Sequence, residues 1–351
     1  MTPKKPTPPA TIYDVARKSK VSIATVSRVL NKKNSVVTEK TRLQVLEAIK
    51  ELNFKPNISA RRLVSNRTNL IEIFFHINNF PVNFKSDWYN GILVGATQVI
   101  QSHNLGLLIN FLVGIPDPQE IVDRVFQNNV DGVLMISPSL EEKHLLELSR
   151  QSTPVVMVGH RAQSPDISFV DTNNIEASEM MVEHLINLGH KKIACLAGPI
   201  HNVQNAKDRL EGFKNAMAKH GLSVPKNFIV PSDGFIKHNG YDEMKKLLKL
   251  SEKPTAIYAC DDMLAMGAWD AVTEAGLKVG KDISIAGYDD IPAVSVAPYS
   301  LTTIRQDMEG LSAAATRLLI SQIKSPEGFV PSQQYESTKL IVRSSTGPAP
   351  K

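Results

Sequence analysis

Residues 21–34, VSIATVSRVLNKKN, interleave serines, a threonine, an arginine and two lysines with apolar residues. Hydroxyl groups and cations of this kind donate hydrogen bonds to anions such as phosphate. At about 100° per residue, Val26, Val29 and Leu30 share one face, with Ile23 at its border. A separate polar arc holds Ala24, Ser27, Arg28 and Asn31. The spacing predicts a short helix with Ser22 as its N-cap. The apolar face of this helix could pack against neighbouring helices, while its polar face could contact a partner.

Two neighbouring helices are predicted to brace this one. Thr11 can cap a helix over IYDVARKS, with Asp14 in its first turn, where a carboxylate favours the helix dipole. After the tight turn SKV and the helix just described, Thr38 can cap a third helix, EKTRLQVLEAIKELNF. We expect its inward residues to be Leu43, Leu46, Ile49 and Leu52. Two short helices joined by a turn and braced by a third are the helix-turn-helix arrangement, which reads DNA.

The charge distribution supports a nucleic-acid partner. Residues 1–67 hold 15 Lys/Arg and 4 Asp/Glu, whereas the rest of the chain holds 25 and 31, although the net charge of the whole is only +5. A cationic head on an acidic body is typical of a DNA binder with a second module. A three-helix bundle whose middle helix is merely solvated would explain the apolar stripe, but not the excess of cations.

Residues 55–68, KPNISARRLVSNRT, follow the head. Pro56 disfavours helix at Lys55, and Asn57 can cap a helix of about two turns, ISARRLV, which is too short to persist alone in water. Composition alone favours a flexible linker. The first ten residues, MTPKKPTPPA, are expected to form an extended tail and do not resemble a secretory signal.

The remaining chain alternates short apolar runs with helical periods, from LIEIFF and WYNGILVGATQVIQSHN to TAIYAC and ISIAGYDD. This βαβα pattern predicts parallel sheets, and two such series predict two α/β subdomains with a ligand crevice at the strand C-termini between them. The expected boundaries are 1–10 for a tail, 11–56 for the helix-turn-helix domain, 57–67 for the hinge, 68–171 plus 301–331 for the first subdomain, 172–300 plus 332–345 for the second, and 346–351 for a second tail.

Several functions find no support in the residues. No GxGxxG, P-loop or GxSxG motif is present, and the histidines, such as His184 and His190, are expected at the surface or at caps; we therefore expect no enzyme, no cofactor and no metal site. The two cysteines, Cys195 and Cys260, fit buried free thiols in a reducing, cytoplasmic setting. No apolar run is long enough to span a membrane.

The head resembles the DNA-binding domain of the lactose/galactose-repressor (LacI/GalR) family through TIYDVARKSKVS-ATVSRVLN, TRLQVLEAIKELNFKPN and SARRL. The resemblance implies a second helix in the major groove and hinge helices of two subunits that fold together in the minor groove, where Leu63 wedges into the central base step beside Ala60. Ile23, Ala24 and Arg28 then fall at base-reading positions, and Ser22, Thr25 and Ser27 at phosphates. The full expected DNA-contacting set is Thr11, Tyr13, Ser22, Ile23, Ala24, Thr25, Ser27, Arg28, Asn31, Asn57, Ala60, Arg61 and Leu63. Lys20 departs from the family, which usually has glycine or asparagine in that turn.

The body resembles the family's periplasmic-binding-protein-like core through NLGHKKIACLAGP, DRLEGFKNAM, KPTAIYACDDMLAMGAWDAV, DISIAGYDDIPA and PYSLTTIRQD. By motif position, the resemblance implies that Arg209, Asp261 and Asp289 line an effector crevice and that an aromatic ring, Phe235, stacks on the ligand. The expected effector-binding set is Trp88, Tyr89, His160, Arg161, Arg209, Phe235, Asp261 and Asp289. For Asp261 and Asp289, helix capping or turn stabilisation is the competing interpretation.

The sequence thus predicts an α-helical helix-turn-helix head with a hinge helix, joined to an α/β core of two parallel-sheet subdomains. The expected function is a homodimeric transcriptional regulator that binds a pseudo-palindromic operator and responds to a sugar or sugar derivative. Two alternatives stay open. The effector could be a purine, a nucleoside or a phosphocarrier protein, and a sugar-binding transport component would share the body, although it would need an export signal and no basic head.

Overall fold

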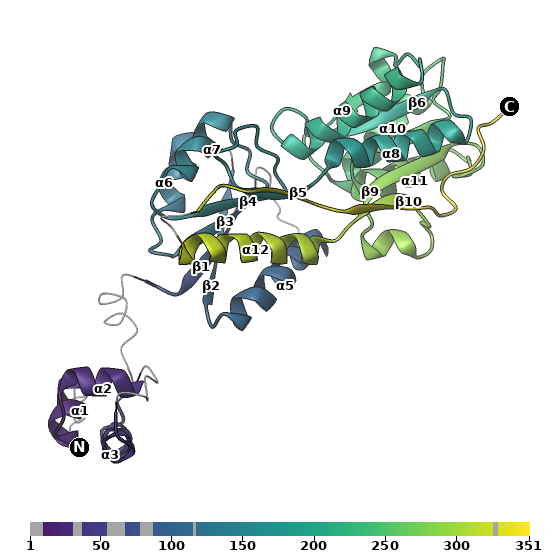
Figure 1. Ribbon diagram of the computed structural model, residues 1–351. Coiled ribbons are helices and arrows are strands. Elements are labelled where there is room, and N and C mark those ends of the chain that lie inside the picture. Colours follow the sequence, from purple (N-terminus) through teal and green to yellow (C-terminus); the bar gives the residue numbers. More distant parts are fainter. Residues whose placement is uncertain (1–9, 31–36, 55–66, 78–86, 115–116, 326–328) are drawn as a thin grey trace, which may run out of the picture. The chain divides into compact units, whose positions relative to one another are not determined.

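The computed structural model describes residues 10–30, 37–54, 67–77, 87–114, 117–325 and 329–351. The chain separates into two compact units, Met1–Thr68 and Asn69–Lys351, which we call the head and the core (Figure 1). Within the described ranges, every helix is too short or too polar to cross a bilayer.

The head contains the three predicted helices, α1 (Ile12–Ser19), α2 (Ile23–Leu30) and α3 (Glu39–Glu51). Their start signals act as the sequence indicates. Thr11 and Asp14 form a reciprocal capping box at α1, and the Thr38 hydroxyl accepts from the Thr41 amide at α3. Lys20 ends α1 in the left-handed conformation, with φ 53° and ψ 37°, so the turn does impose the geometry that usually selects glycine.

The inward face of α3 differs from the prediction. Val45 and Ala48 are the buried residues, with exposed fractions of 0% and 3%, whereas Leu43 and Leu46 are 55% and 40% exposed. Three residues make less than one full turn of a helix, so the predicted set, 43, 46, 49 and 52, drifts around the helix and cannot share one face. The expectation for Leu43 and Leu46 was therefore wrong.

The core contains two six-stranded sheets. The first has the order β11-β5-β4-β3-β1-β2, in which every pairing is parallel. Its strands are β1 (Leu70–Ile77), β2 (Gly106–Val113), β3 (Gly132–Ile136), β4 (Val155–Val158), β5 (Phe169–Thr172) and β11 (Gln333–Glu336). The helices that cover it are α5 (Asp87–Ser102), α6 (Pro118–Val125), α7 (Glu142–Ser149) and α12 (Met308–Lys324).

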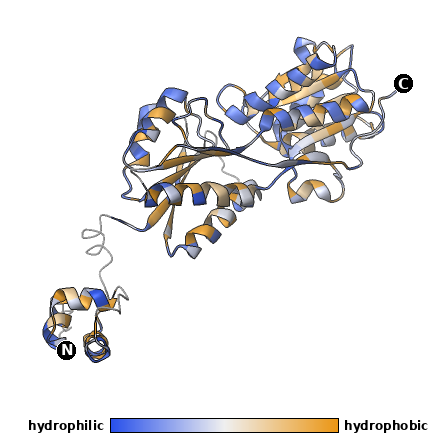
Figure 2. Ribbon diagram, in the orientation of Figure 1, coloured by the Kyte–Doolittle hydropathy of each residue, from blue (hydrophilic) through white to orange (hydrophobic). Residues whose placement is uncertain are grey.

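The second sheet has the order β12-β10-β9-β8-β6-β7 and is parallel apart from β12. Its strands are β6 (Ile193–Gly198), β7 (Ile229–Pro231), β8 (Ala256–Ala259), β9 (Ser284–Asp289), β10 (Thr302–Gln306) and β12 (Thr338–Ile341). The accompanying helices are α8 (Asn174–Asn187), α9 (Gln204–Lys219), α10 (Lys237–Leu248), α11 (Asp262–Glu274), and the short 3₁₀ helices η2 (Lys226–Phe228) and η3 (Pro292–Ser295). In both sheets the central strands are mostly apolar and the outer helix faces are mostly polar, so apolar side chains gather on each side of each sheet (Figure 2).

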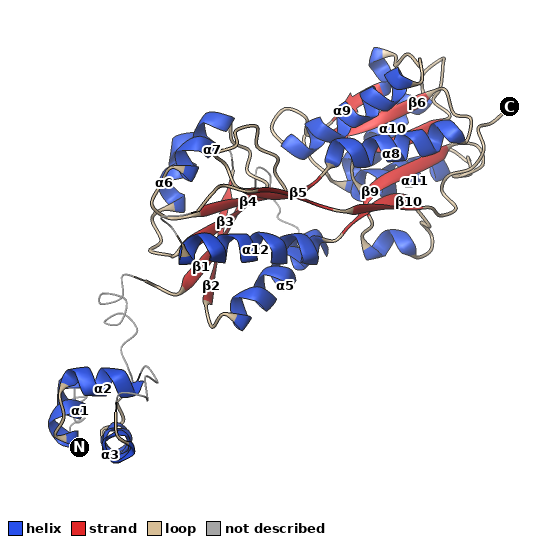
Figure 3. Cartoon of the chain, viewed as in Figure 1, coloured by secondary structure: helices blue, strands red, loops and turns tan. Residues whose placement is uncertain are grey.

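The structure corrects the expected subdomain boundaries. Residues 301–331 were assigned to the first subdomain, yet β10 lies in the second sheet, where Thr302 pairs with Ala286 of β9. Residues 332–345 were assigned to the second subdomain, yet β11 lies in the first sheet beside β5. The chain passes between the sheets after β5, after β10 and after β11 (Figure 3). Pairing between strands that are far apart in the chain decides this, and a local apolar pattern carries no information about it.

The last residues also differ from the expected tail at 346–351. The Ala349 amide donates to the Leu188 carbonyl at 2.9 Å, and the Gly347 carbonyl accepts from His190 Nε2. His190, predicted at the surface or a cap, is 1% exposed and also bonds Thr255 and Ser284. The C-terminal segment therefore packs along the end of α8 and completes the second subdomain.

Candidate functional site

The exposed side of α2 carries the predicted base-reading residues. Ile23, Ala24 and Arg28 are exposed, while Val26 and Val29 on the opposite side are buried in the hydrophobic cluster of the head. Ser22 Oγ lies 2.9 Å from Thr25 Oγ1 and accepts from the Thr25 amide at 3.2 Å, so Ser22 starts the helix. The packing of α2 thus fixes which side chains face outward.

Only some of the other residues predicted to contact DNA lie within the described ranges. Tyr13 is 63% exposed, Thr11 is exposed, and Ser27 is half-buried. The remaining predictions fall on residues outside the described ranges. These are Asn31, Asn57, Ala60, Arg61 and Leu63.

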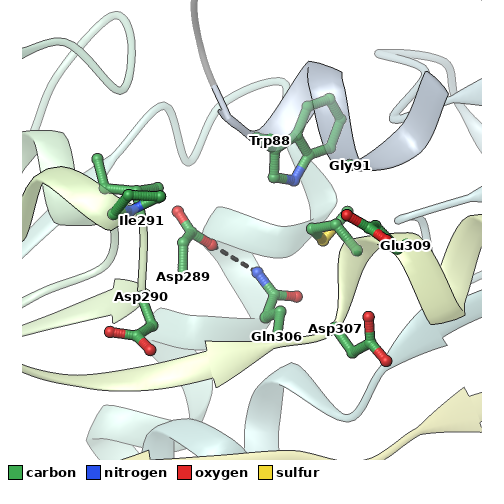
Figure 4. A pocket seen from close by; sticks show the side chains of 10 residues that line it. Trp88, Gly91, Asp289, Asp290, Ile291, Gln306, Asp307 and Glu309 are labelled. Carbon is green, nitrogen blue, oxygen red and sulfur yellow. Dashed lines mark hydrogen bonds between the residues drawn. The ribbon is translucent and has the colours of Figure 1, made fainter. Parts of the chain in front are cut away.

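A cleft of about 200 Å³ lies between the two subdomains of the core. The first subdomain contributes the N-terminal turns of α5, with Trp88, and of α12, with Glu309. The second contributes the C-terminal ends of β9 and β10 and the residues that follow β9 (Figure 4). The lining residues are Trp88, Gly91, Asp289, Asp290, Ile291, Pro292, Gln306, Asp307, Met308 and Glu309. The C-terminal ends of β9 and β10 therefore open onto this cleft, as the parallel topology requires.

Arg209 organises the polar floor beside this cleft. The side chain is almost fully buried, and its guanidinium donates to Asn174 Oδ1 at 2.8 Å and to the Cys260 carbonyl at 2.7 Å. It lies 3.6 Å from Asp289 Oδ1, and its carbon is 3.7 Å from the Tyr288 ring centroid. A cation held by so many groups has a fixed direction, which suits it to orient a ligand and neighbouring carboxylates.

Phe235 lies near the same guanidinium, with 5.9 Å between the Arg209 carbon and the ring centroid. The ring packs on the backbone of Gly198 at the end of β6, because a β-carbon there would lie 2.4 Å from the ring edge. An aromatic face beside a fixed arginine and a carboxylate provides the apolar and polar surfaces that a small polyhydroxylated molecule requires.

The two predicted carboxylates play different roles. Asp289 projects toward Gln306, which donates to it, and lies opposite Trp88 (Figure 4). Asp261 is occupied as the N-cap of α11 and accepts from the Met263 and Leu264 amides. Burial raises the pKa of both carboxyls, and the neighbouring Asp289 raises that of Asp261 further. The competing interpretation of Asp261 as a cap is therefore correct for its hydrogen bonds, which are made to the first turn of α11.

Three further predicted residues lie at the first subdomain's edge. Tyr89 packs its ring on Phe75 and Trp88, with centroids 5.4 and 5.1 Å away. His160 is buried, and that burial lowers the pKa of its imidazole to about 4. Arg161 reaches toward Asp208 of α9 and forms an ion pair with it.

Sequence reasoning missed several residues that the structure brings to the cleft. Gln306 and Asp307 lie in the segment PYSLTTIRQD, where Gln306 ends β10 and Asp307 follows it, in the same sheet as Asp289. Outside the residues that line the cleft, Asn205 on the first turn of α9 has a buried Oδ1 atom with no hydrogen-bond partner among the described residues. Its only sequence signal was its position four residues before Arg209, one helical turn away on the same face.

A helix-turn-helix unit joined to a core of two parallel sheets with a cleft between them defines a class, the DNA-binding regulators with an effector-binding module. Residues 11–57 match the lacI family of bacterial regulatory proteins, and residues 182–346 match a periplasmic binding protein-like domain. The ribose operon repressor of Escherichia coli (strain K12) is 32% identical over 337 residues, which cover 95% of this chain and 98% of that repressor. The chain belongs to the lacI family.

Other relatives span similar lengths. The transcriptional repressor PurR of Haemophilus influenzae (strain PittEE) is 33% identical over 344 residues, 96% of this chain and 98% of PurR. Catabolite control protein A of Priestia megaterium is 32% identical over 311 residues, 88% and 91% of the two chains.

Among solved structures, a Lac repressor dimer bound to operator and the anti-inducer ONPF matches with a TM-score of 0.84 and 27% identity, covering 97% of this chain and all of that one. A complex of the regulator CelR with cellobiose matches with a TM-score of 0.70 and 27% identity, covering 96% and 99%. The protein is a DNA-binding transcriptional repressor of this family.

Proposed function

We propose that the protein is a homodimeric repressor of carbohydrate-utilisation genes, which binds a pseudo-palindromic operator through α2 and a sugar through the cleft. The observation that carries the proposal is the arrangement of Arg209, Asp289 and Phe235 behind one wall of the cleft, with Trp88 on the other. The carboxylate of Asp289 and the side-chain amide of Gln306 lie side by side, so they can accept hydrogen bonds from, and donate hydrogen bonds to, neighbouring hydroxyls of a sugar. Aromatic rings can cover the apolar face of the sugar ring.

The charge of the cleft favours an uncharged effector over a phosphorylated one. Its lining includes four acidic side chains, namely Asp289, Asp290, Asp307 and Glu309. The cations that contact these carboxylates are already engaged. Arg305 and Arg343 pair with Asp290, and Arg209 lies beside Asp289. A phosphate entering this cleft would meet carboxylates, and like charges repel at short range. Of the solved relatives, CelR was captured with cellobiose, a neutral sugar.

A purine effector is the second candidate, because Trp88 and Phe235 could stack on a base and PurR is among the relatives. A thermal-shift screen separates the two, with D-ribose, cellobiose, ribose 5-phosphate and adenine as probes. We expect a neutral sugar to raise the melting temperature. Stabilisation by adenine alone would favour the purine candidate instead.

The role of Asp289 is tested with Asp289→Asn. Because hydrogen bonds to a charged group contribute about 1.5–3 kcal/mol, we expect the variant to bind the stabilising sugar roughly 10- to 150-fold more weakly. Asp242→Asn, an exposed carboxylate on α10, is the matched control and should bind normally. Isothermal titration calorimetry gives the constants. If Asp289→Asn bound the sugar as tightly as the unsubstituted protein, the ligand would have to lie elsewhere.

DNA reading is tested with Arg28→Met. A bidentate contact from arginine to guanine contributes about 1–3 kcal/mol of base discrimination, so we expect the preference for a duplex selected from a randomised pool to fall by roughly 5- to 150-fold. Arg17→Met removes the same charge from an exposed side chain of α1 and should preserve the preference. Fluorescence anisotropy measures both. Equal losses by the two variants would show that Arg28 contributes charge alone.

A further inference from the structure

The ion pair between Arg161 and Asp208 joins the two subdomains. Arg161 follows β4 of the first sheet, and Asp208 lies on α9, which packs in the second subdomain. The contact is a two-pronged fork, with Arg161 Nε 2.9 Å from Asp208 Oδ2 and Nη2 2.7 Å from Oδ1. A bidentate pair of this kind has strict geometry, so it can form in only one arrangement of the subdomains.

Burial makes this contact sensitive to that arrangement. The Asp208 side chain is 2% exposed, and besides the fork it accepts one more hydrogen bond, from Gln204 Nε2 at 2.7 Å. The Arg161 side chain is 28% exposed, so it retains some water on its outer side. Removing one partner of a buried pair leaves a desolvated charge, whereas exposed pairs contribute little. Parting the subdomains would leave the Asp208 carboxylate with Gln204 alone or bring water to it.

The position of Asp208 on α9 connects the fork to the cleft. Asp208 precedes Arg209, whose guanidinium holds Asp289 and lies over Tyr288. Asn205 is one turn earlier, and its Nδ2 lies 3.8 Å from the β-carbon position of Gly159, just before His160 and Arg161. One stretch of α9 therefore contacts the first subdomain and carries the residues beside the effector cleft.

We propose that Arg161 and Asp208 form a latch, which holds the subdomains in the arrangement of this structure and thereby sets how far an effector must shift them. Arg161 is a positioning residue in this scheme, since it acts through its ion pair with Asp208 of α9. The scheme rests on the proposed effector cleft. An effector with higher affinity for the latched arrangement keeps the ion pair between Arg161 and Asp208 formed when it binds. An effector with higher affinity for another arrangement has to break that ion pair in order to bind.

The latch is tested without any effector, so its failure and the failure of the effector proposal are separable. Spin labels are attached in the full-length protein at Lys143→Cys on α7 and Lys246→Cys on α10, both exposed positions on different subdomains. Dilution with unlabelled protein isolates distances within one subunit, and the fully buried Cys195 and Cys260 are checked by label counting. Pulsed electron–electron double resonance then gives the distance distribution.

We expect Arg161→Met and Asp208→Asn each to move the distribution away from that of the unsubstituted protein, and the double variant to match the single variants. Arg161→Lys, which keeps the charge but loses the fork, should lie between. Arg124→Met breaks the pair with Glu120, which lies within α6, and should change nothing. Single variants with an unchanged distribution, or a double variant with the sum of two separate shifts, would overturn the latch.

A functional measurement complements the distances. Coupling between sites typically changes affinity by about 5- to 150-fold, so we expect Arg161→Met, Asp208→Asn and the double variant to change affinity for the selected duplex by a similar factor of at least about five, all in one direction. A merely local role for the pair would alter thermal stability and leave the affinity for DNA unchanged. That outcome would also overturn the proposal.

Discussion

Asp171 shows how one residue at a subdomain crossing can depend on pH. It is the penultimate residue of β5, is 1% exposed, and accepts from the Thr172 amide at 2.7 Å. Burial raises the pKa of its carboxyl from 3.8 to about 7. The folded protein therefore binds this proton more tightly than the unfolded chain does, and its stabilising effect is lost as pH rises through about 7.

Asp171→Asn removes the titration and keeps an oxygen that can accept from Thr172. We expect the free energy of unfolding of the variant, relative to the unsubstituted protein, to be more favourable at pH 8 than at pH 5. Urea unfolding of the full-length chain at both pH values measures this difference. Asp166→Asn, at an exposed position, is the control. A difference that does not change with pH would contradict the assignment.

Residue-level function was only partly accessible from the sequence. The outward residues of α2 could be predicted, because a helical period assigns faces once the caps are known. Arg209 and Asp289 came through resemblance and lie together in the structure. The partnership of Gln306 with Asp289, and that of Arg161 with Asp208, could not be predicted, because each joins segments whose approach depends on the whole topology.

At the scale of elements, the turn between α1 and α2 contains a local conflict. Lys20 occupies a left-handed conformation that costs a residue with a β-carbon about 1 kcal/mol. Lys20→Gly should therefore stabilise the head by up to about 1 kcal/mol, less what glycine gains in the unfolded chain. Amide hydrogen exchange of α1 and α2 in the full-length protein measures this gain.

The control for that prediction is Gln44→Gly, on an exposed face of α3, where glycine should instead destabilise by about 1 kcal/mol. If Lys20→Gly accelerated exchange as Gln44→Gly does, the turn would be relaxed in solution and the cost would not exist.

Helix pairing in the core depends on close backbone contacts that a hydrophobic period does not reveal. A β-carbon on Gly95 of α5 would lie 2.0 Å from the Glu309 carbonyl of α12, and one on Gly267 of α11 would lie 1.9 Å from the Lys237 carbonyl of α10. The α5–α12 contact also brings Trp88 and Met308 to the lining of the cleft. The alternation of helices and strands in the core was predicted from the sequence, but these pairings were not, because a glycine in a helix has several possible explanations.

For the whole molecule, the edge of the first sheet supports the proposed dimer. β2 is an edge strand, and Ile109 on it is 39% exposed, which is a liability for a strand with unpaired backbone groups. We expect Ile109→Glu to shift the protein from dimer to monomer in sedimentation equilibrium. Binding to a palindromic duplex should weaken with it, since two heads would no longer be joined.

Val330→Glu is the matched control, because Val330 is 76% exposed and does not lie on β2. It should leave the association state unchanged. A dimer that persisted in Ile109→Glu would place the subunit contact on another surface.

The three passages of the chain between the sheets have a consequence for how the protein is made. The first sheet receives its edge strand β11, and the second receives β10 and β12, only from the part of the chain that follows Leu301. A ribosome that has released the chain as far as Leu301 has therefore exposed two incomplete sheets with apolar faces. Both subdomains are completed only when the segment after Leu301 has emerged. Until then the apolar faces of both sheets stay partly uncovered, and the nascent chain is prone to aggregate.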